Sequence, residues 1–348
     1  MRAGKTVRAP VSHRGPGAGP PREIPMESVG TPLMWTLFAA FVLVALLIDF
    51  FAMSKQGAHK VTMKEAAIWS VIWVAVSFVF LAGLWFYLDA NTTREVANAK
   101  SLEFLTGYLV EKALAVDNIF VFLMVFTYFA VPLEFQKRVL MIGILGALVL
   151  RALMILVGAW LISQFHWVLY LFGAFLVFTG IKMWWAAGQE PDLADNPALK
   201  WIRSHLKIAP HYDGERFTTL VGGVKHYTPL FVVIVLIGIV DVIFAVDSIP
   251  AIFAITTDPF IVLTSNVFAI LGLRAMYFLL AGMHEKFHLL SYGLAIVLVF
   301  IGTKMLLIDV YKIPVSWSLV FTVTVLAATM LLSLRFPARG KEAEGSAS

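Results

Sequence analysis

Long apolar stretches alternate with short polar segments along most of this chain. Each stretch is close to the roughly 20 residues that an α-helix needs to cross the hydrocarbon core of a bilayer. The pattern therefore predicts an all-α polytopic membrane protein with about nine transmembrane helices. The predicted helices cover residues 33–52, 67–88, 102–129, 138–163, 167–186, 229–254, 260–281, 288–308 and 315–335.

Polar segments flank and interrupt a single membrane domain, residues 32–336. Residues 1–31 are rich in Pro, Gly and Arg, a composition that cannot bury a core, and predict a disordered tail. Residues 187–228 are polar and predict a cytoplasmic loop, with a short amphipathic helix around 199–206. Residues 337–348 predict a cytoplasmic tail.

Basic residues in the short loops predict the orientation, because cytoplasmic loops carry an excess of Lys and Arg. An outside N-terminus and a cytoplasmic C-terminus place nine of these residues inside and three outside. The net charge of +5 fits this bias and needs no nucleic-acid partner. The inner residues are Lys55, Lys60, Lys64, Lys137, Arg138, Lys286, Arg335, Arg339 and Lys341, and the outer ones are Arg94, Lys100 and Lys312.

The chain has no cysteine, which removes disulfides, thiolate metal sites and dithiol redox chemistry. It also lacks a Gly-rich phosphate loop, a Ser/His/Asp arrangement and an HExxH motif. We therefore expect neither an enzyme nor a permanently bound cofactor.

Two motifs inside the apolar stretches share the sequence Ala-Val-Asp. They are Glu-Lys-Ala-Leu-Ala-Val-Asp-Asn-Ile at 111–119 and Asp-Val-Ile-Phe-Ala-Val-Asp-Ser-Ile at 241–249. In each motif a second carboxylate precedes the shared Asp by six residues. A carboxylate at the centre of a membrane helix costs about 2.5–3.5 kcal/mol on insertion scales, so these acids indicate a function.

The motifs belong to a longer internal repeat. Leu-Arg-Ala recurs at 150–152 and 273–275, and residues 170–183 align without gaps to 292–305. Each copy holds three predicted helices, so the second copy must enter the membrane from the opposite side. Inverted repeats are common in secondary transporters, whose substrate sites lie near the midplane where the repeats meet. The alternative, a duplication retained for stability alone, leaves the acids unexplained. The two copies cover about 102–186 and 229–308.

Glu111 and Asp117 cannot hold one ion together on a straight helix, since six residues separate them by about 9 Å along the axis and 120° around it. Either the two acids line a wide polar face, or the helix unwinds between them. Pro250, just past Asp247, is compatible with a bend in the second copy. The simpler geometry brings Asp117 and Asp247 together across the pseudo-twofold axis.

Oxygen ligands at such a site favour a hard divalent cation. Asn118 and Ser248 directly follow the two shared Asp residues and add neutral oxygens. There is no thiolate, and the histidines fall in the tail, loops or helix ends, so the site suits Mg²⁺, Ca²⁺ or Mn²⁺ rather than Cu(I) or Zn²⁺. The predicted metal residues are Glu111, Asp117, Asn118, Asp241, Asp247 and Ser248.

Four cationic residues accompany the acids as supporting charge partners. Arg151 and Arg274 lie near the middle of their helices, where they either neutralise structural acids or replace the charge of the cation when the site is empty. Lys182 and Lys304 lie near helix ends, from which they can extend to the interface. The polar run 264–266 can line a path or hold helices together, and we leave it out of the predicted site.

The two acid motifs, together with Thr-Asp-Pro-Phe-Ile-Val-Leu-Thr-Ser-Asn at 257–266, resemble the TerC family of bacterial integral membrane proteins. Residues 29–33 and 270–282 resemble its Alx branch in particular. The resemblance runs from about residue 26 to the last predicted helix.

The resemblance implies a bacterial inner-membrane protein related to the LysE transporter superfamily, in a branch associated with alkaline pH, redox modulation and manganese export. It implies that Glu111, Asp117, Asp241 and Asp247 are acids on the metal path. The family usually has a Glu three residues before Asp241, where this chain has Gly238. The resemblance therefore also implies a different metal affinity or coupling here.

Two functions fit these observations. The first is export of a divalent metal ion, above all Mn²⁺, by alternating access of the two repeats. The membrane potential opposes cation exit, so export needs a counter-ion flow such as H⁺. The second is a non-transporting membrane partner, either a redox modulator or a factor that assists secretion and metalation of exported proteins. Residues 187–228 would then dock the protein partner, and membrane lipid surrounds the helices in both cases.

Overall fold

The computed structural model describes residues 28–54, 62–187, 197–281 and 289–336, although the side chains of residues 49–54 and of Asp117 lie outside the description. The predicted tails, residues 1–31 and 337–348, fall outside it except for residues 28–31.

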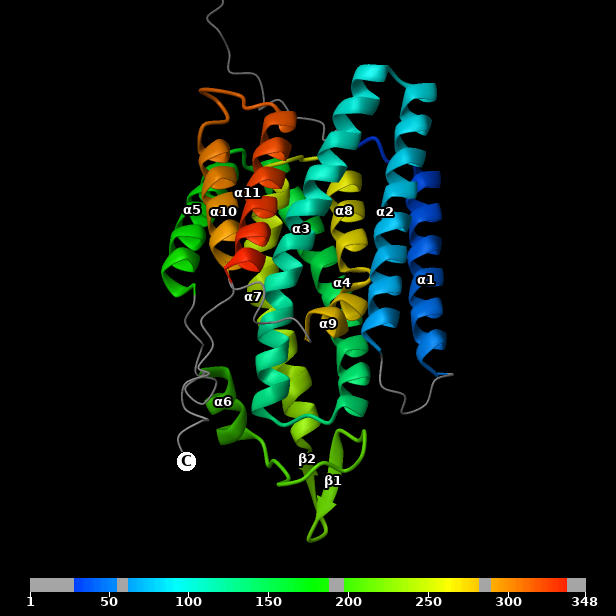
Figure 1. Cartoon of the computed structure of the whole chain (residues 1–348), viewed down its shortest axis with the longest axis vertical. Helices are drawn as coiled ribbons and strands as arrows, with labels where there is room; N and C mark the ends of the chain where they lie inside the picture. Colours follow the sequence, from blue (N-terminus) through cyan, green and yellow to red (C-terminus); the bar gives the residue numbers. More distant parts are fainter. Residues whose placement is uncertain (1–27, 55–61, 188–196, 282–288, 337–348) are drawn as a thin grey trace, which may run out of the picture.

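Helices make up nearly all of the described fold, as the hydropathy pattern predicts (Figure 1). Two strands, β1 (Thr218–Val221) and β2 (Val224–Tyr227), form an antiparallel hairpin. The helices are α1 (Pro32–Ser54), α2 (Met63–Asn91), α3 (Arg94–Tyr128), α4 (Leu133–Gln164), α5 (Val168–Ala186), α6 (Pro197–His205), α7 (Pro229–Phe253), α8 (Pro259–Ile270), α9 (Leu273–Ala281), α10 (Leu290–Leu306) and α11 (Val315–Arg335).

Within the described residues, six segments are long and apolar enough to cross a membrane, namely α2, α4, α5, α7, α11 and the combined segment of α8 and α9. Helix α10 and the Pro32–Ile48 part of α1 are shorter apolar helices. The longest helix, α3, is not among the six, and it carries Glu103, Glu111, Lys112 and Asp117 along its middle. The chain is thus a multi-helical membrane-type fold, while nine full spans stay a prediction.

Helix α3 begins at Arg94, eight residues before the predicted start, because polar residues at its beginning are helical as well. Thr93 caps this end, where its Oγ1 accepts a hydrogen bond from the Val96 amide at 3.3 Å. The hydropathy pattern finds only the apolar part of such a helix.

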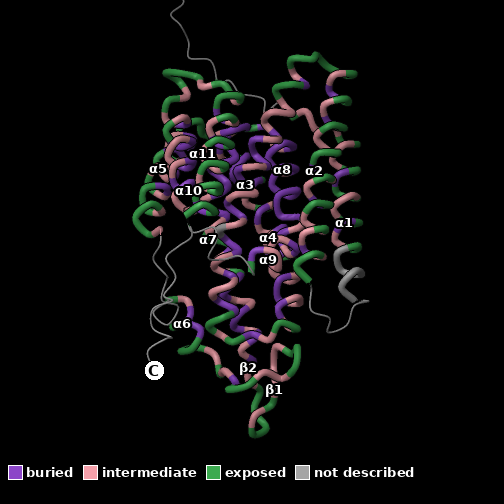
Figure 2. The backbone as a smooth tube through the Cα atoms, viewed as in Figure 1, coloured by how far each residue is buried: buried purple, intermediate pink, exposed green. Residues whose placement is uncertain are grey.

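The bundle has a buried centre and two apolar flanks. In Figure 1, α1 and α2 lie on one side, α5, α10 and α11 lie on the other, and α3, α4, α7 and α8 run between them. Buried positions concentrate in these central helices, whereas the outward sides of α1, α2 and α11 are exposed (Figure 2). Exposed apolar side chains on the flanks are the expected surface of a protein that meets lipid.

Helices α5 and α10 pack closely through small residues. A Cβ added to Gly180 would lie 2.9 Å from the Ala295 carbonyl oxygen, and one added to Gly302 would lie 2.7 Å from the Gly173 carbonyl oxygen. In the alignment of 170–183 with 292–305, Gly180 matches Gly302 and Gly173 matches Ala295. The two contacts are therefore equivalent, and the helices are antiparallel.

The predicted helix at 260–281 is in fact two helices, α8 and α9, separated by Leu271 and Gly272. Gly272 has φ +82°, a conformation that favours glycine. A Cβ here would also lie 2.7 Å from side-chain atoms of Trp73 on α2. Local backbone conformation, which hydropathy does not report, thus interrupts the predicted helix.

The polar segment between α5 and α7 has more structure than a loop. Helix α6 buries Leu199 and Ile202, as the predicted amphipathic helix requires. The β1–β2 hairpin was not predicted, although Gly222 and Gly223 between apolar and β-branched residues are a hairpin signal, and both have positive φ. This region lies at one end of the bundle (Figure 1).

Tyr212 fixes this region to the turn between α3 and α4. Its hydroxyl donates a hydrogen bond to the Phe129 carbonyl oxygen at 2.6 Å, and burial raises the pKa of the phenol above its ordinary value. Arg138 on α4 also pairs with Glu215 at 2.8 Å. The segment after α6 is therefore fastened to the membrane domain.

Candidate functional site

Charged residues from three helices meet near the middle of the bundle. Arg151 on α4 forms an ion pair with Glu111 on α3. Its Nη2 lies 3.7 Å from Asp241 Oδ1 on α7, and its Nη1 donates a hydrogen bond to Ser248 Oγ at 3.2 Å. We call these four residues the central charge cluster.

The central charge cluster is buried, with 2 to 7% of each residue exposed. Two carboxylates share one guanidinium, so the ionised cluster carries an excess negative charge. Asp241 Oδ2 and Arg151 Nε have no hydrogen-bond partner among the described residues. Buried polar atoms usually have partners, so Asp241 Oδ2 has unused capacity to accept a proton or a cation, whereas Arg151 Nε is a donor that lacks an acceptor in the described part of the chain.

Packing between α4 and α7 sets the rotation of these helices. A Cβ on Gly158 would lie 2.8 Å from the Phe253 ring, and one on Gly143 would lie 3.3 Å from Ile237 Cγ2. Both contacts advance in the same direction along the two helices, so α4 and α7 are parallel. This pairing brings the α7 face that holds Asp241 and Ser248 against Arg151.

The two acids of the α7 motif point to different neighbours. Asp241 and Ser248 are seven residues apart and share a helix face. Asp247 lies on another face, where its Oδ1 accepts a hydrogen bond from Thr179 Oγ1 on α5 at 3.3 Å. Helices α3 and α7 are continuous through their motifs, and Pro250 lies inside α7. Neither helix therefore unwinds between its two acids.

The remaining predicted residues stand as follows. The side chain of Asp117 lies outside the described residues, so its meeting with Asp247 stays a prediction. Asn118 is buried on α3. Arg274 is partly buried on α9, Lys304 is partly buried on α10, and Lys182 is exposed on α5. Gly238 is exposed, and a Cβ there would meet nothing within 4 Å, so packing does not require glycine at this position.

Asn266 on α8 is a polar residue that the sequence reasoning left out. It is 1% exposed, and neither its amide nitrogen nor its amide oxygen has a hydrogen-bond partner among the described residues. The hydroxyls of Thr264 and Ser265 instead donate to carbonyl oxygens of their own helix at 2.7 Å. The sequence signal for Asn266 is the polar run at 264–266 inside an apolar stretch.

A second polar cluster lies at the end of the bundle where α3 begins. Glu103 on α3 accepts a hydrogen bond from Thr256 Oγ1 at 2.6 Å and pairs with Lys100 at 2.9 Å. Asp258, which caps α8, accepts a hydrogen bond from the Val29 amide at 3.0 Å and lies 3.6 Å from Lys100. These contacts join α3, the turn before α8 and the start of the described chain, and we call them the end closure.

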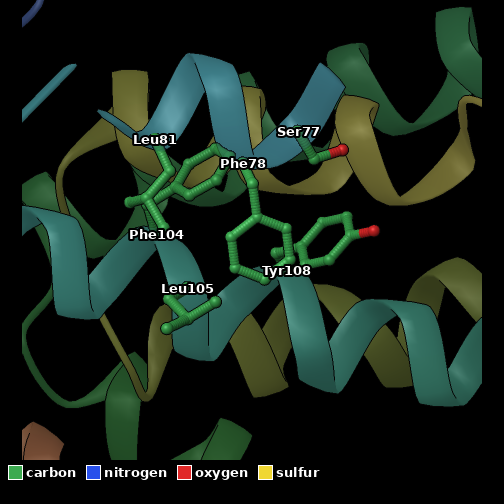
Figure 3. Close-up of a pocket in the computed structure, with 6 residues that line it drawn as sticks. All are labelled: Ser77, Phe78, Leu81, Phe104, Leu105 and Tyr108. Carbon is green, nitrogen blue, oxygen red and sulfur yellow. The ribbon is translucent and has the colours of Figure 1, made fainter. Parts of the chain in front are cut away.

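A small hollow between α2 and α3 is separate from the charged residues (Figure 3). It has almost no room even for a water molecule, whereas most small-molecule sites have roughly 300–1,000 Å³. Among the described side chains, no three acids or histidines converge as ligands of a metal ion. The lining residues are Ser77, Phe78, Leu81, Phe104, Leu105 and Tyr108.

Comparison with known proteins finds relatives over most of the chain. A protein of Escherichia coli K12 named "Putative membrane-bound redox modulator Alx" is 55% identical over 308 residues, which are 88% of this chain and 96% of that protein. The protein of the same name from Salmonella typhi is 54% identical over the same shares. An uncharacterized membrane protein of Myxococcus xanthus is 46% identical over 88% of this chain and 93% of its own length.

No solved structure matches the chain. The model of the "Integral membrane protein TerC family" matches residues 96–341, which include the central charge cluster, the α8–α9 break and the α5–α10 pair. The chain therefore belongs to the TerC family of multi-pass integral membrane proteins.

Proposed function

We propose that this protein is a divalent cation transporter of the bacterial inner membrane that exports Mn²⁺ by alternating access of two inverted repeats. The observation that carries the proposal is the convergence of Glu111 and Asp241 on Arg151. These acids hold equivalent positions in the two motifs, each six residues before the shared Asp. One acid from each repeat thus faces the same buried guanidinium.

Arg151 gives this arrangement the properties of an empty cation site. Its guanidinium lies between the two carboxylates, where it supplies the charge that a bound cation would otherwise provide. Displacing it would leave carboxylate and hydroxyl oxygens of Glu111, Asp241 and Ser248, which are donors that suit Mn²⁺ and Mg²⁺. Exchange of guanidinium for metal is therefore the proposed event at the site.

Two further features support the transporter, and the first of them also supports inverted repeats. The α5–α10 pair makes equivalent contacts through Gly180 and Gly302, as a twofold axis perpendicular to antiparallel helices requires. The α8–α9 segment is interrupted near its centre, and discontinuous helices are typical of secondary transporters.

Export against a negative-inside potential of 100 mV costs about 2.3 kcal/mol for each elementary charge, so the proposal includes an inward counter-ion. Buried carboxylates bind protons as well as metal ions, and H⁺ is the simplest counter-ion for this site.

The test is Mn²⁺ uptake into inside-out proteoliposomes with purified protein. We expect Glu111→Gln, Asp241→Asn, Asp117→Asn and Asp247→Asn each to reduce the initial rate at least tenfold. Glu95→Gln, at an exposed position near the start of α3, is the matched control and should transport normally. Uptake by the wild type at the level of empty vesicles would refute the transporter.

The alternative is a non-transporting membrane partner, which the name of the curated relatives favours. The chain has no cysteine for direct thiol redox chemistry, so this role would act through another protein. The region of α6 and the β1–β2 hairpin is the proposed docking surface. A partner of this kind should retain its function with Asp247→Asn, whereas the transporter should not.

A further inference from the structure

Lys112 follows Glu111 directly on α3, but its side chain contacts α8, which belongs to the second predicted repeat. Its Nζ donates hydrogen bonds to the carbonyl oxygens of Ala269 at 3.0 Å and Leu271 at 3.4 Å. Ala269 is the second-last residue of α8, and Leu271 caps it. The ammonium of α3 therefore lies at the interruption between α8 and α9.

The interruption creates the acceptors that Lys112 uses. The last carbonyl groups of a helix have no intrahelical donor, and the C-terminal end of a helix carries partial negative charge. Ala269 and Leu271 are 0% and 3% exposed, so water has little access to their backbone. Among the described side chains, no carboxylate forms an ion pair with Lys112. Its charge is therefore stabilised by these backbone dipoles.

A second helix, α2, also packs against the interruption. Gly272 packs against the side chain of Trp73 so closely that a Cβ would lie 2.7 Å from it. The interruption therefore has a packing contact with Trp73 and a charged hydrogen-bond contact with Lys112. The contact with Trp73 supplies no hydrogen-bond donor to the Ala269 and Leu271 carbonyl groups. The Lys112 ammonium supplies this donor.

We propose that Lys112 is a positioning residue whose ammonium locks the α8–α9 break to α3 and so couples the two repeats. Glu111 and Lys112 are adjacent, about 100° apart around the helix. A rotation of α3 that moves Glu111 away from Arg151 also withdraws Lys112 from the break. The role of this coupling in transport rests on the proposed function, whereas the lock itself does not.

The lock is tested by amide hydrogen exchange of the full-length protein in detergent micelles. Lys112→Met keeps the apolar stem and removes the donor, and we expect amides of residues 269–281 to exchange about tenfold faster, since a hydrogen bond to a charged group is worth at least that factor. Lys112→Arg keeps a donor and should restore most of the protection. Lys64→Met, an equal charge loss at an exposed position of α2, should change nothing in this segment.

Unchanged protection of residues 269–281 in Lys112→Met would overturn the lock. Faster exchange spread equally over all helices, α11 included, would also overturn it, because the residue would then stabilise the whole fold. Failure of Lys112→Arg to restore protection would overturn the role of the donated hydrogen bonds.

The coupling is tested on the same variants in proteoliposomes. We expect Lys112→Met to bind Mn²⁺ with wild-type affinity but to transport it about tenfold more slowly. A loss of Mn²⁺ binding equal to that of Glu111→Gln would overturn the positioning role, because it would make Lys112 part of the ion site. If the wild type itself transports no Mn²⁺, the proposed function fails, and the exchange result still decides the lock.

Discussion

At the scale of single residues, the guanidinium of Arg151 offsets the charge of two buried acids, Glu111 and Asp241. Burial of Glu111 and Asp241 without a cation would cost several kcal/mol for each charge. Residue types and spacing in the sequence predicted these acids and Ser248 as metal residues, with Arg151 as a supporting charge partner. They did not show that the first acid of each motif would meet Arg151, because helix rotation depends on packing contacts such as that of Gly158 with Phe253.

Arg151→Met should lower the free energy of unfolding by about 3–5 kcal/mol, because it leaves two buried carboxylates without their cation. Adding Glu111→Gln and Asp241→Asn to this variant should recover most of the loss, since no uncompensated charge remains. Denaturant unfolding in micelles, followed by tryptophan fluorescence, measures both differences. A triple variant no more stable than Arg151→Met would show that the arginine acts through packing instead.

At the scale of elements, close contacts through glycine hold helices such as α5 and α10 against each other. Although α3 begins eight residues before its predicted start, hydropathy located most apolar helices to within a few residues, because the length and apolarity of a segment follow directly from the sequence. It missed the α8–α9 break, which depends on the backbone conformation of Gly272 and its contact with Trp73. It also missed the hairpin at 218–227, whose short strands lie in a polar segment.

Gly180→Ala and Gly302→Ala should destabilise the protein by similar amounts, about 1–3 kcal/mol, because each Cβ would enter backbone atoms of the facing helix. Gly83→Ala on α2 is the control, since a Cβ there meets nothing within 4 Å and alanine favours the helix. Thermal unfolding in micelles provides the comparison. Strongly unequal effects of the two α5–α10 substitutions would contradict the equivalence of their contacts.

At the scale of the whole molecule, two of the described polar connections lie at opposite ends of the bundle. The α6–hairpin region lies at one end, and the turn at residues 307–314 lies at the other (Figure 1). The basic residues of the sequence predict that the first end is cytoplasmic. This assignment depends on loop charge rather than on packing, so it needs its own measurement.

The absence of native cysteine makes the orientation directly measurable. We expect Tyr311→Cys to react with a membrane-impermeant maleimide in spheroplasts, because Tyr311 is exposed in the predicted outer turn. Leu220→Cys, in the exposed hairpin, should react only after permeabilisation. The reverse pattern would place the N-terminus inside and would contradict the orientation predicted from the basic residues.

Alternating access also requires that the end closure around Glu103 can open. Thr256→Val removes the hydroxyl that donates to Glu103 at 2.6 Å and nearly preserves side-chain volume. A hydrogen bond to a charged acceptor contributes about 1.5–3 kcal/mol, so its loss should raise the open fraction roughly tenfold or more. Ser101→Cys reports this opening, because Ser101 lies two residues before Glu103 on α3 and its hydroxyl is buried, and its labelling should accelerate by the same factor. Thr303→Val, which removes a hydrogen bond to its own helix only, is the control. Equal labelling rates in the two backgrounds would mean that the Glu103 contact does not hold this end shut, and the gate would have to lie deeper, at the central charge cluster itself.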